Sequence, residues 1–185
     1  PKTGKASKCT TYLDGLNCPT GFQFYKDGVI VMQSPDLWFA RDTNMDGKVD
    51  SLDDPPERIL HGLDAADSHH ETNSICYEPG GALYLSDGVF HRTSVETLSG
   101  PVRNVNGAIY RFEPLTSKFE RYVPYGFANP HGRVFDAWGN DIITDATGNA
   151  NYFGPGFSGF LDNGAHPSYQ QFWVRPSRPC PGTHI

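Results

Sequence analysis

Residues 21–32 read Gly21-Phe22-Gln23-Phe24-Tyr25-Lys26-Asp27-Gly28-Val29-Ile30-Val31-Met32. Two runs of aromatic and β-branched residues flank a Lys-Asp-Gly turn, and the Asp-Gly pair supplies the positive φ that tight hairpins need. The stretch therefore predicts two antiparallel strands joined by a short turn. The pattern returns at residues 74–85 and 133–144, with glycine-containing turns at residues 78–81 and 136–140.

The hairpins begin roughly 55 residues apart, which is the scale of a propeller blade. Two further strands are expected in each of the first two repeats, at residues 37–40 and 58–60 and at residues 108–112 and 119–123. The sequence therefore predicts an all-β fold, a β-propeller of which this chain covers about two complete blades plus part of a third. Three blades cannot close a ring, so the remainder of the propeller chain is an expected partner.

Three regions follow from this pattern. Residues 1–20 are expected to form an N-terminal edge segment and residues 21–154 the blades. Residues 155–185 are expected to form a long ordered loop leading to the rest of the propeller, because their aromatic residues argue against disorder. The chain starts at Pro1 without a methionine or a signal peptide, which indicates a processed or internal fragment.

Charge and hydropathy exclude two functional classes. The 185 residues include 15 Lys and Arg against 21 Asp and Glu, which gives a net charge of −6. An acidic balance argues against a nucleic-acid-binding surface, which needs clustered cations. The sequence has no apolar run of about 18 residues, so no segment of it is expected to span a membrane.

The four cysteines leave two interpretations open. Disulfides between Cys9 and Cys18 and between Cys76 and Cys180 would indicate an oxidising compartment and a periplasmic or extracellular location. Alternatively all four are free thiols, since Cys76 lies in an apolar strand where a buried thiol is equally expected.

The strongest motif is the acidic loop at residues 42–53, which reads Asp-Thr-Asn-Met-Asp-Gly-Lys-Val-Asp-Ser-Leu-Asp. Oxygen-bearing side chains occupy loop positions 1, 3, 5, 9 and 12, and glycine occupies position 6, where the chain must turn sharply. This spacing wraps oxygen ligands around one point, as Ca²⁺ requires, and it predicts a structural calcium site. The alternative is an acidic surface turn. The expected ligands are the side chains of Asp42, Asn44, Asp46, Asp50 and Asp53 and the backbone carbonyl of Lys48.

Further motifs lie at residues 33–39, 42–48, 88–97, 125–130, 149–153 and 178–181. Together they resemble a bacterial family of membrane-bound dehydrogenases with a sorbosone/glucose dehydrogenase-like propeller, often fused to c-type haem modules. The resemblance covers most of the chain from Gly21 onward. It implies a quinoprotein-like, six-bladed propeller that oxidises a sugar or alcohol. It also implies a cytochrome c module carrying haem c outside this chain, and membrane association through other parts of the full protein.

The resemblance implies site residues as well. In the related soluble quinoprotein glucose dehydrogenases, which hold pyrroloquinoline quinone, a histidine nine residues before a proline takes the substrate hydroxyl proton as hydride leaves for the quinone. His70 stands nine residues before Pro79, and imidazole titrates near neutral pH. Asn129 matches a residue that holds the quinone, and His131, which replaces a glutamine, is either a cofactor contact or structural. Ala128 replaces an arginine, and this loss of a bidentate carboxylate partner argues against pyrroloquinoline quinone.

The histidines also have other interpretations. Asp67 and His69 can orient His70, or His70 can simply cap a polar loop. His69 and His70, beside Asp67 and Glu71, can instead bind a transition metal. His91 lies in one of the family motifs and is either a partner contact or a turn residue.

Two functions remain open. The first is an extracytoplasmic, calcium-binding sugar or alcohol dehydrogenase in which His70 is the base and electrons pass to a quinone or haem. The second is a non-catalytic, calcium-stabilised propeller scaffold that binds a partner protein or glycan. Propellers host unrelated functions, so the fold does not choose between them.

Overall fold

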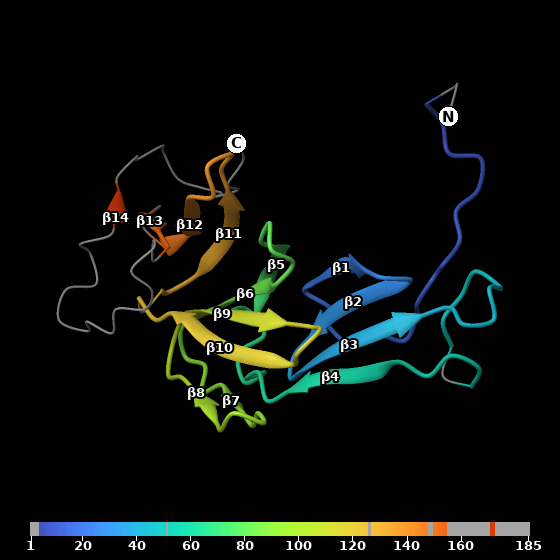
Figure 1. Ribbon diagram of the computed structural model, residues 1–185, viewed down its shortest axis with the longest axis horizontal. Coiled ribbons are helices and arrows are strands. Elements are labelled where there is room, and N and C mark those ends of the chain that lie inside the picture. The colour runs from blue at the N-terminus through green and yellow to red at the C-terminus, as the bar shows by residue number, and fades with distance from the viewer. Residues whose placement is uncertain (1–3, 51, 126, 148–149, 155–170, 173–185) are drawn as a thin grey trace.

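A computed structural model describes residues 4–50, 52–125, 127–147, 150–154 and 171–172. Over these residues the chain forms three four-stranded antiparallel sheets and one two-stranded hairpin (Figure 1). The first sheet contains β1 (Gly21–Tyr25), β2 (Gly28–Gln33), β3 (Asp36–Arg41) and β4 (Glu57–His61). The second contains β5 (Asn73–Tyr77), β6 (Leu83–Asp87), β9 (Ala108–Glu113) and β10 (Lys118–Val123), with the hairpin of β7 (Ser94–Val95) and β8 (Val102–Arg103) inserted after β6. The third contains β11 (Pro130–Phe135), β12 (Asp141–Asp145), β13 (Ala150–Phe153) and β14 (Gln171–Phe172).

The strands predicted for the first two sheets and for the start of the third are confirmed. The third sheet, expected only in part, continues through β13 and β14. Strand β14 falls within residues 155–185, the segment expected to be a long loop, and the rest of that segment lies outside the described residues. The β7–β8 hairpin was not predicted, because strands of two residues are too short to show alternation.

Adjacent sheets pack face to face. On β6, Leu83 and Leu85 join the core shared with the first sheet, whereas Tyr84 between them joins the core shared with the third. The first strand of the second sheet, β5, contacts the first strands β1 and β11 of both neighbours. Four-stranded meanders packed in this way are blades, and the fold is a β-propeller.

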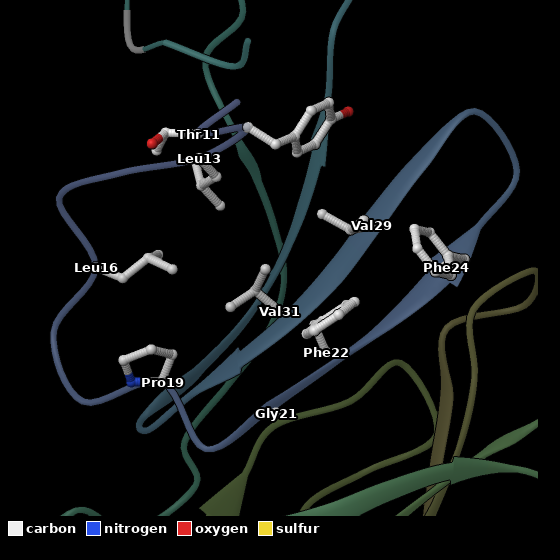
Figure 2. A pocket seen from close by; sticks show the side chains of 10 residues that line it. Thr11, Leu13, Leu16, Pro19, Gly21, Phe22, Phe24, Val29 and Val31 are labelled. Atoms are coloured by element: carbon white, nitrogen blue, oxygen red, sulfur yellow. The ribbon is translucent and has the colours of Figure 1, made fainter. Parts of the chain in front are cut away.

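The outer face of the first sheet is apolar. Phe22 lies opposite Val31 and Phe24 opposite Val29 across the β1–β2 pair. The N-terminal segment arches over this face and leaves a cavity of about 520 Å³ between itself and the two strands (Figure 2). Phe24 is 75% exposed there, so a large part of the face has no cover among the described residues.

The described cysteines are free thiols. Cys9 and Cys18 are exposed and unpaired, so the disulfide considered between them is absent. Cys76 is also free, and burial raises the pKa of its thiol. Cys180 lies outside the described residues. Within the described ranges, no helix has the length and apolar character needed to cross a bilayer.

Candidate functional site

His70 lies in a tight turn just before β5. Its Nδ1 is 3.1 Å from Asp67 Oδ2, and its backbone amide donates to the Asp67 carbonyl at 3.0 Å. The hydrogen bond from His70 and a second one from the backbone amide of His69 hold the pKa of Asp67 below its usual value. Because an ionised carboxylate only accepts hydrogen bonds, Nδ1 carries a proton and Nε2 is left as the basic nitrogen.

The loop after β6 connects the His70 turn to the segment containing Asn129. Gly88 donates its amide to the His70 carbonyl at 3.2 Å, and the next residue, Val89, donates to the Ala128 carbonyl at 2.9 Å. A Cβ atom at Gly88 would lie 2.8 Å from the Cβ of His70, so only glycine permits this approach. The two segments singled out in the sequence are therefore brought to one end of the sheets.

His131 lies within electrostatic range of His69 and His70. Burial lowers the pKa of His131, and the charges of His69 and His70 lower it further. The ring centroids of His69 and His70 are 4.7 Å apart in an edge-to-face arrangement. His131 is thus disfavoured as a cation and tends toward the neutral imidazole.

Asp145, which sequence reasoning did not select, organises the Asn129 segment. Its buried carboxylate accepts the backbone amides of Ala128 at 2.8 Å, Asn129 at 3.0 Å and Thr147 at 2.9 Å. The side-chain oxygen of Asn129 is buried and receives no hydrogen bond from the described residues. A buried acceptor without a donor costs about 1–3 kcal/mol, so this oxygen is suited to a buried water.

Phe90 is the second feature that the sequence did not reveal. Its backbone has φ of 76°, a conformation that is strained for a bulky residue, and its side chain is 65% exposed. The ring meets His70 edge to face at 5.4 Å, and its amide is held by Asn106 Oδ1 at 3.2 Å. An exposed aromatic ring fixed beside an imidazole offers an apolar surface to a ligand.

His91 lies in the interior. Its side chain is fully buried against Asp87, with 2.5 Å between Nδ1 and Oδ1. The interpretation of His91 as a partner contact is therefore wrong, because no atom of its side chain reaches the surface.

The acidic loop is ordered by its own carboxylates. Asp42 accepts the amides of Asp46 at 3.1 Å and Gly47 at 2.7 Å, and Gly47 has the positive φ of 90° that the sharp turn needs. Asp50 accepts the amides of Asp53 and Leu52, each at 2.9 Å, and these bonds lower its pKa.

The loop is also anchored from outside. Tyr12 accepts the Val49 amide at its carbonyl, 2.7 Å away, and its hydroxyl accepts the Asp42 amide at 3.1 Å. Asp54, the residue after the expected last ligand Asp53, is buried and accepts the Thr43 amide at 2.8 Å. The spacing of the expected ligands gave no sign that Asp54 would be buried while Asp53 stayed exposed.

No three His, Cys, Asp or Glu side chains among the described residues lie close enough to share a metal ion. This applies to the acidic loop and to the pair His69–His70 alike. The chemical types of the donor groups in the loop are nevertheless those that Ca²⁺ prefers, namely carboxylates, one amide oxygen and a backbone carbonyl.

Residues 2–166 match the family model described as Domain of unknown function (DUF7133). The chain belongs to this family. A solved X-ray structure, described as a candidate gluconolactonase, is similar to the DUF7133 chain with a TM-score of 0.47 and 18% sequence identity. The match covers 73% of this chain and 44% of that one, and no curated protein matches.

Pyrroloquinoline quinone, which the sequence resemblance implies, does not fit this DUF7133 chain. Residue 128 is an alanine, and the nearby Arg133 is buried and paired with Asp141. The segment therefore offers no guanidinium for a quinone carboxylate, although the free oxygen of Asn129 remains.

Proposed function

We propose that this DUF7133 propeller is extracytoplasmic and that it oxidises a sugar or other alcohol, with His70 as the general base. The observation that carries the proposal is the Asp67–His70 pair, which uses Nδ1 and leaves Nε2 as the unbound ring nitrogen, in a turn that Gly88 and Val89 link to the Asn129 segment. Nε2 would accept the hydroxyl proton of the substrate. Because pyrroloquinoline quinone does not fit, His70 is assigned this proton transfer alone. The proposed acceptor of the two electrons is a haem c on a fused cytochrome module outside this chain, or a quinone other than pyrroloquinoline quinone.

One neighbour of His70 supports a sugar substrate. The exposed ring of Phe90 lies edge to face with His70 and can pack against the apolar face of a sugar ring. An aldose offers this face, whereas a short linear alcohol lacks it.

We expect the intact protein to reduce an artificial redox dye in the presence of aldoses. Replacing Phe90 by alanine should raise KM for aldoses about 2- to 10-fold and leave small alcohols unaffected, because an aromatic contact is worth about 0.5–1.5 kcal/mol. Steady-state dye reduction measures both, and Trp138→Ala, which removes an exposed aromatic ring from the turn between β11 and β12, is the matched control. Lactone hydrolysis without any dye reduction would overturn the dehydrogenase proposal.

The second candidate is a non-catalytic scaffold, favoured by the absence of a guanidinium at residue 128. We propose that the remainder of the propeller chain covers the apolar outer face of β1 and β2, as a neighbouring sheet covers each face of the second sheet. The cavity lined by Phe22, Phe24 and Leu16 would then lie between two blades. A partner protein or glycan would bind elsewhere on such a closed ring.

The acidic loop is proposed to hold one structural Ca²⁺ in either case. Chelation with EGTA should lower the melting temperature of the intact protein, and Ca²⁺ at about 100 times its Kd should restore about 2.7 kcal/mol. Asp46→Asn should abolish the calcium-dependent shift, whereas Asp14→Asn, an exposed acid outside the loop, should retain it. Differential scanning calorimetry with and without Ca²⁺ is the measurement. Equal melting temperatures under both conditions would leave the loop as an acidic turn.

A further inference from the structure

Asp87, at the end of β6, accepts hydrogen bonds from four side chains while fully buried. His91 Nδ1 lies 2.5 Å from its Oδ1, and Thr93 donates to Oδ2 at 2.7 Å. The hydroxyls of Thr72 and Tyr110 donate from 3.3 Å. Four donors saturate a carboxylate, which needs no proton of its own to satisfy them.

His91 is held between two acceptors. One ring nitrogen meets Asp87, and the other, Nε2, lies 3.1 Å from the carbonyl oxygen of Asp67. A carbonyl cannot donate, so Nε2 must carry hydrogen, and the remaining proton lies between Nδ1 and the carboxylate. Burial opposes this charge, but the hydrogen bond and charge of Asp87 outweigh it and raise the pKa of His91.

The carbonyl that His91 holds belongs to the residue that orients His70. The same Asp67 carbonyl also accepts the His70 amide, and the Asp67 carboxylate accepts His70 Nδ1. The fully buried Asp87–His91 pair is therefore linked to the turn by one hydrogen bond, from His91 to the Asp67 carbonyl. A second link comes from Gly88, the residue after Asp87, whose amide donates to the His70 carbonyl.

We propose that the buried Asp87–His91 pair is a positioning pair for His70, fixing the Asp67 turn so that Nδ1 of His70 stays protonated and Nε2 stays available as the base. The proposal rests on the proposed function for its catalytic meaning, but the positioning itself concerns only the tautomer and order of the turn. His91 and Asp87 touch no substrate and act through Asp67.

The effect is expected to depend on pH. Three carboxylates face His91, namely Asp87 on β6, Asp64 and Glu71. The charge of Asp64 also raises the pKa of His91. Burial raises the pKa of Glu71, and the charge of His91 opposes that rise. Because the folded-state pKa is raised, the stabilisation is fully present below about pH 6.5, the usual histidine value, and is lost as pH rises through the folded-state pKa. The His70 turn should loosen over the same range.

Long-range ¹H–¹⁵N spectra of the imidazoles in the intact protein test this directly. In the wild type, the neutral form of His70 should carry its proton on Nδ1, and this preference should weaken as His91 titrates. His91→Phe should mix the two neutral tautomers of His70 and speed amide exchange of His69 and His70 at least 10-fold. His61→Gln, which removes an exposed histidine on β4 from its pair with the buried Asp36 on β3, should change neither.

The outcomes separate the two proposals. Should His91→Phe fail to fold, the wild-type titration alone decides, because it needs no substitution. A His70 tautomer that ignores the titration of His91, or a His91 that titrates near its usual value, would overturn the positioning pair. Absence of dye reduction in the wild type, with the coupled tautomer change present, would overturn only the dehydrogenase.

Discussion

Replacing His70 by glutamine is expected to lower kcat for aldose oxidation about 10²- to 10⁴-fold, the usual contribution of a general base. Glutamine keeps a donor for Asp67 and nearly the same volume, but its amide accepts no proton at neutral pH. The KM should change little, because proton transfer to Nε2 belongs to the transition state and not to substrate binding. Stopped-time dye reduction over a range of aldose concentrations gives both constants.

His69→Gln is the matched control for this experiment. His69 is the adjacent histidine of the same turn, is exposed, and has only its backbone amide bound to Asp67. Its substitution should leave kcat within about threefold of the wild type if Nε2 of His70 is the base. Comparable losses in the two variants would mean that the turn matters for its charge or shape, and that neither imidazole is the base.

Local alternation was sufficient to predict most of the fold. Residues 21–32 carry both the period-two pattern and the Asp-Gly turn, and β1 and β2 form with Tyr25 opposite Gly28. Strand β13 was missed because Ala-Asn-Tyr-Phe shows no apolar alternation, and only its pairing with β12 and β14 makes it a strand. Tertiary pairing of this kind leaves no signal in a short window.

Sequence motifs identified only those site residues whose side-chain type and motif already suggest a chemical role. His70 and Asn129 could be singled out from their motifs, and the structure brings their segments together. His91 and Asp87 could not be paired, because a buried histidine and a surface histidine are identical in sequence. Asp145 was hidden for the same reason, since its role is to accept backbone amides from a segment 16 residues away.

Arg133 is buried between the second and third sheets. Its side chain has no exposed surface, its guanidinium pairs with Asp141, and its central carbon lies 3.7 Å from the ring centroid of Tyr84. Burial raises the pKa of Asp141 to about 6 although Arg133 opposes the shift. Two nitrogens of Arg133 and one oxygen of Asp141 have no partner among the described residues. The pair is therefore costly to bury and more costly to break.

Arg133→Leu is accordingly expected to destabilise the protein by about 3–5 kcal/mol at pH 8, because it leaves the Asp141 carboxylate buried without a cation. Since the folded-state pKa of Asp141 is raised to about 6, the carboxyl is protonated at pH 5 in both proteins, and the penalty there should be about 1–3 kcal/mol smaller. Urea unfolding at the two pH values measures this difference.

Arg103→Leu, which breaks an exposed pair with Glu96, should cost less than about 1 kcal/mol at either pH. The double variant with Asp141→Leu should recover most of the loss, since it removes the unpaired charge. A penalty that is independent of pH and persists in the double variant would assign the role of Arg133 to its packing on Tyr84 instead of its charge.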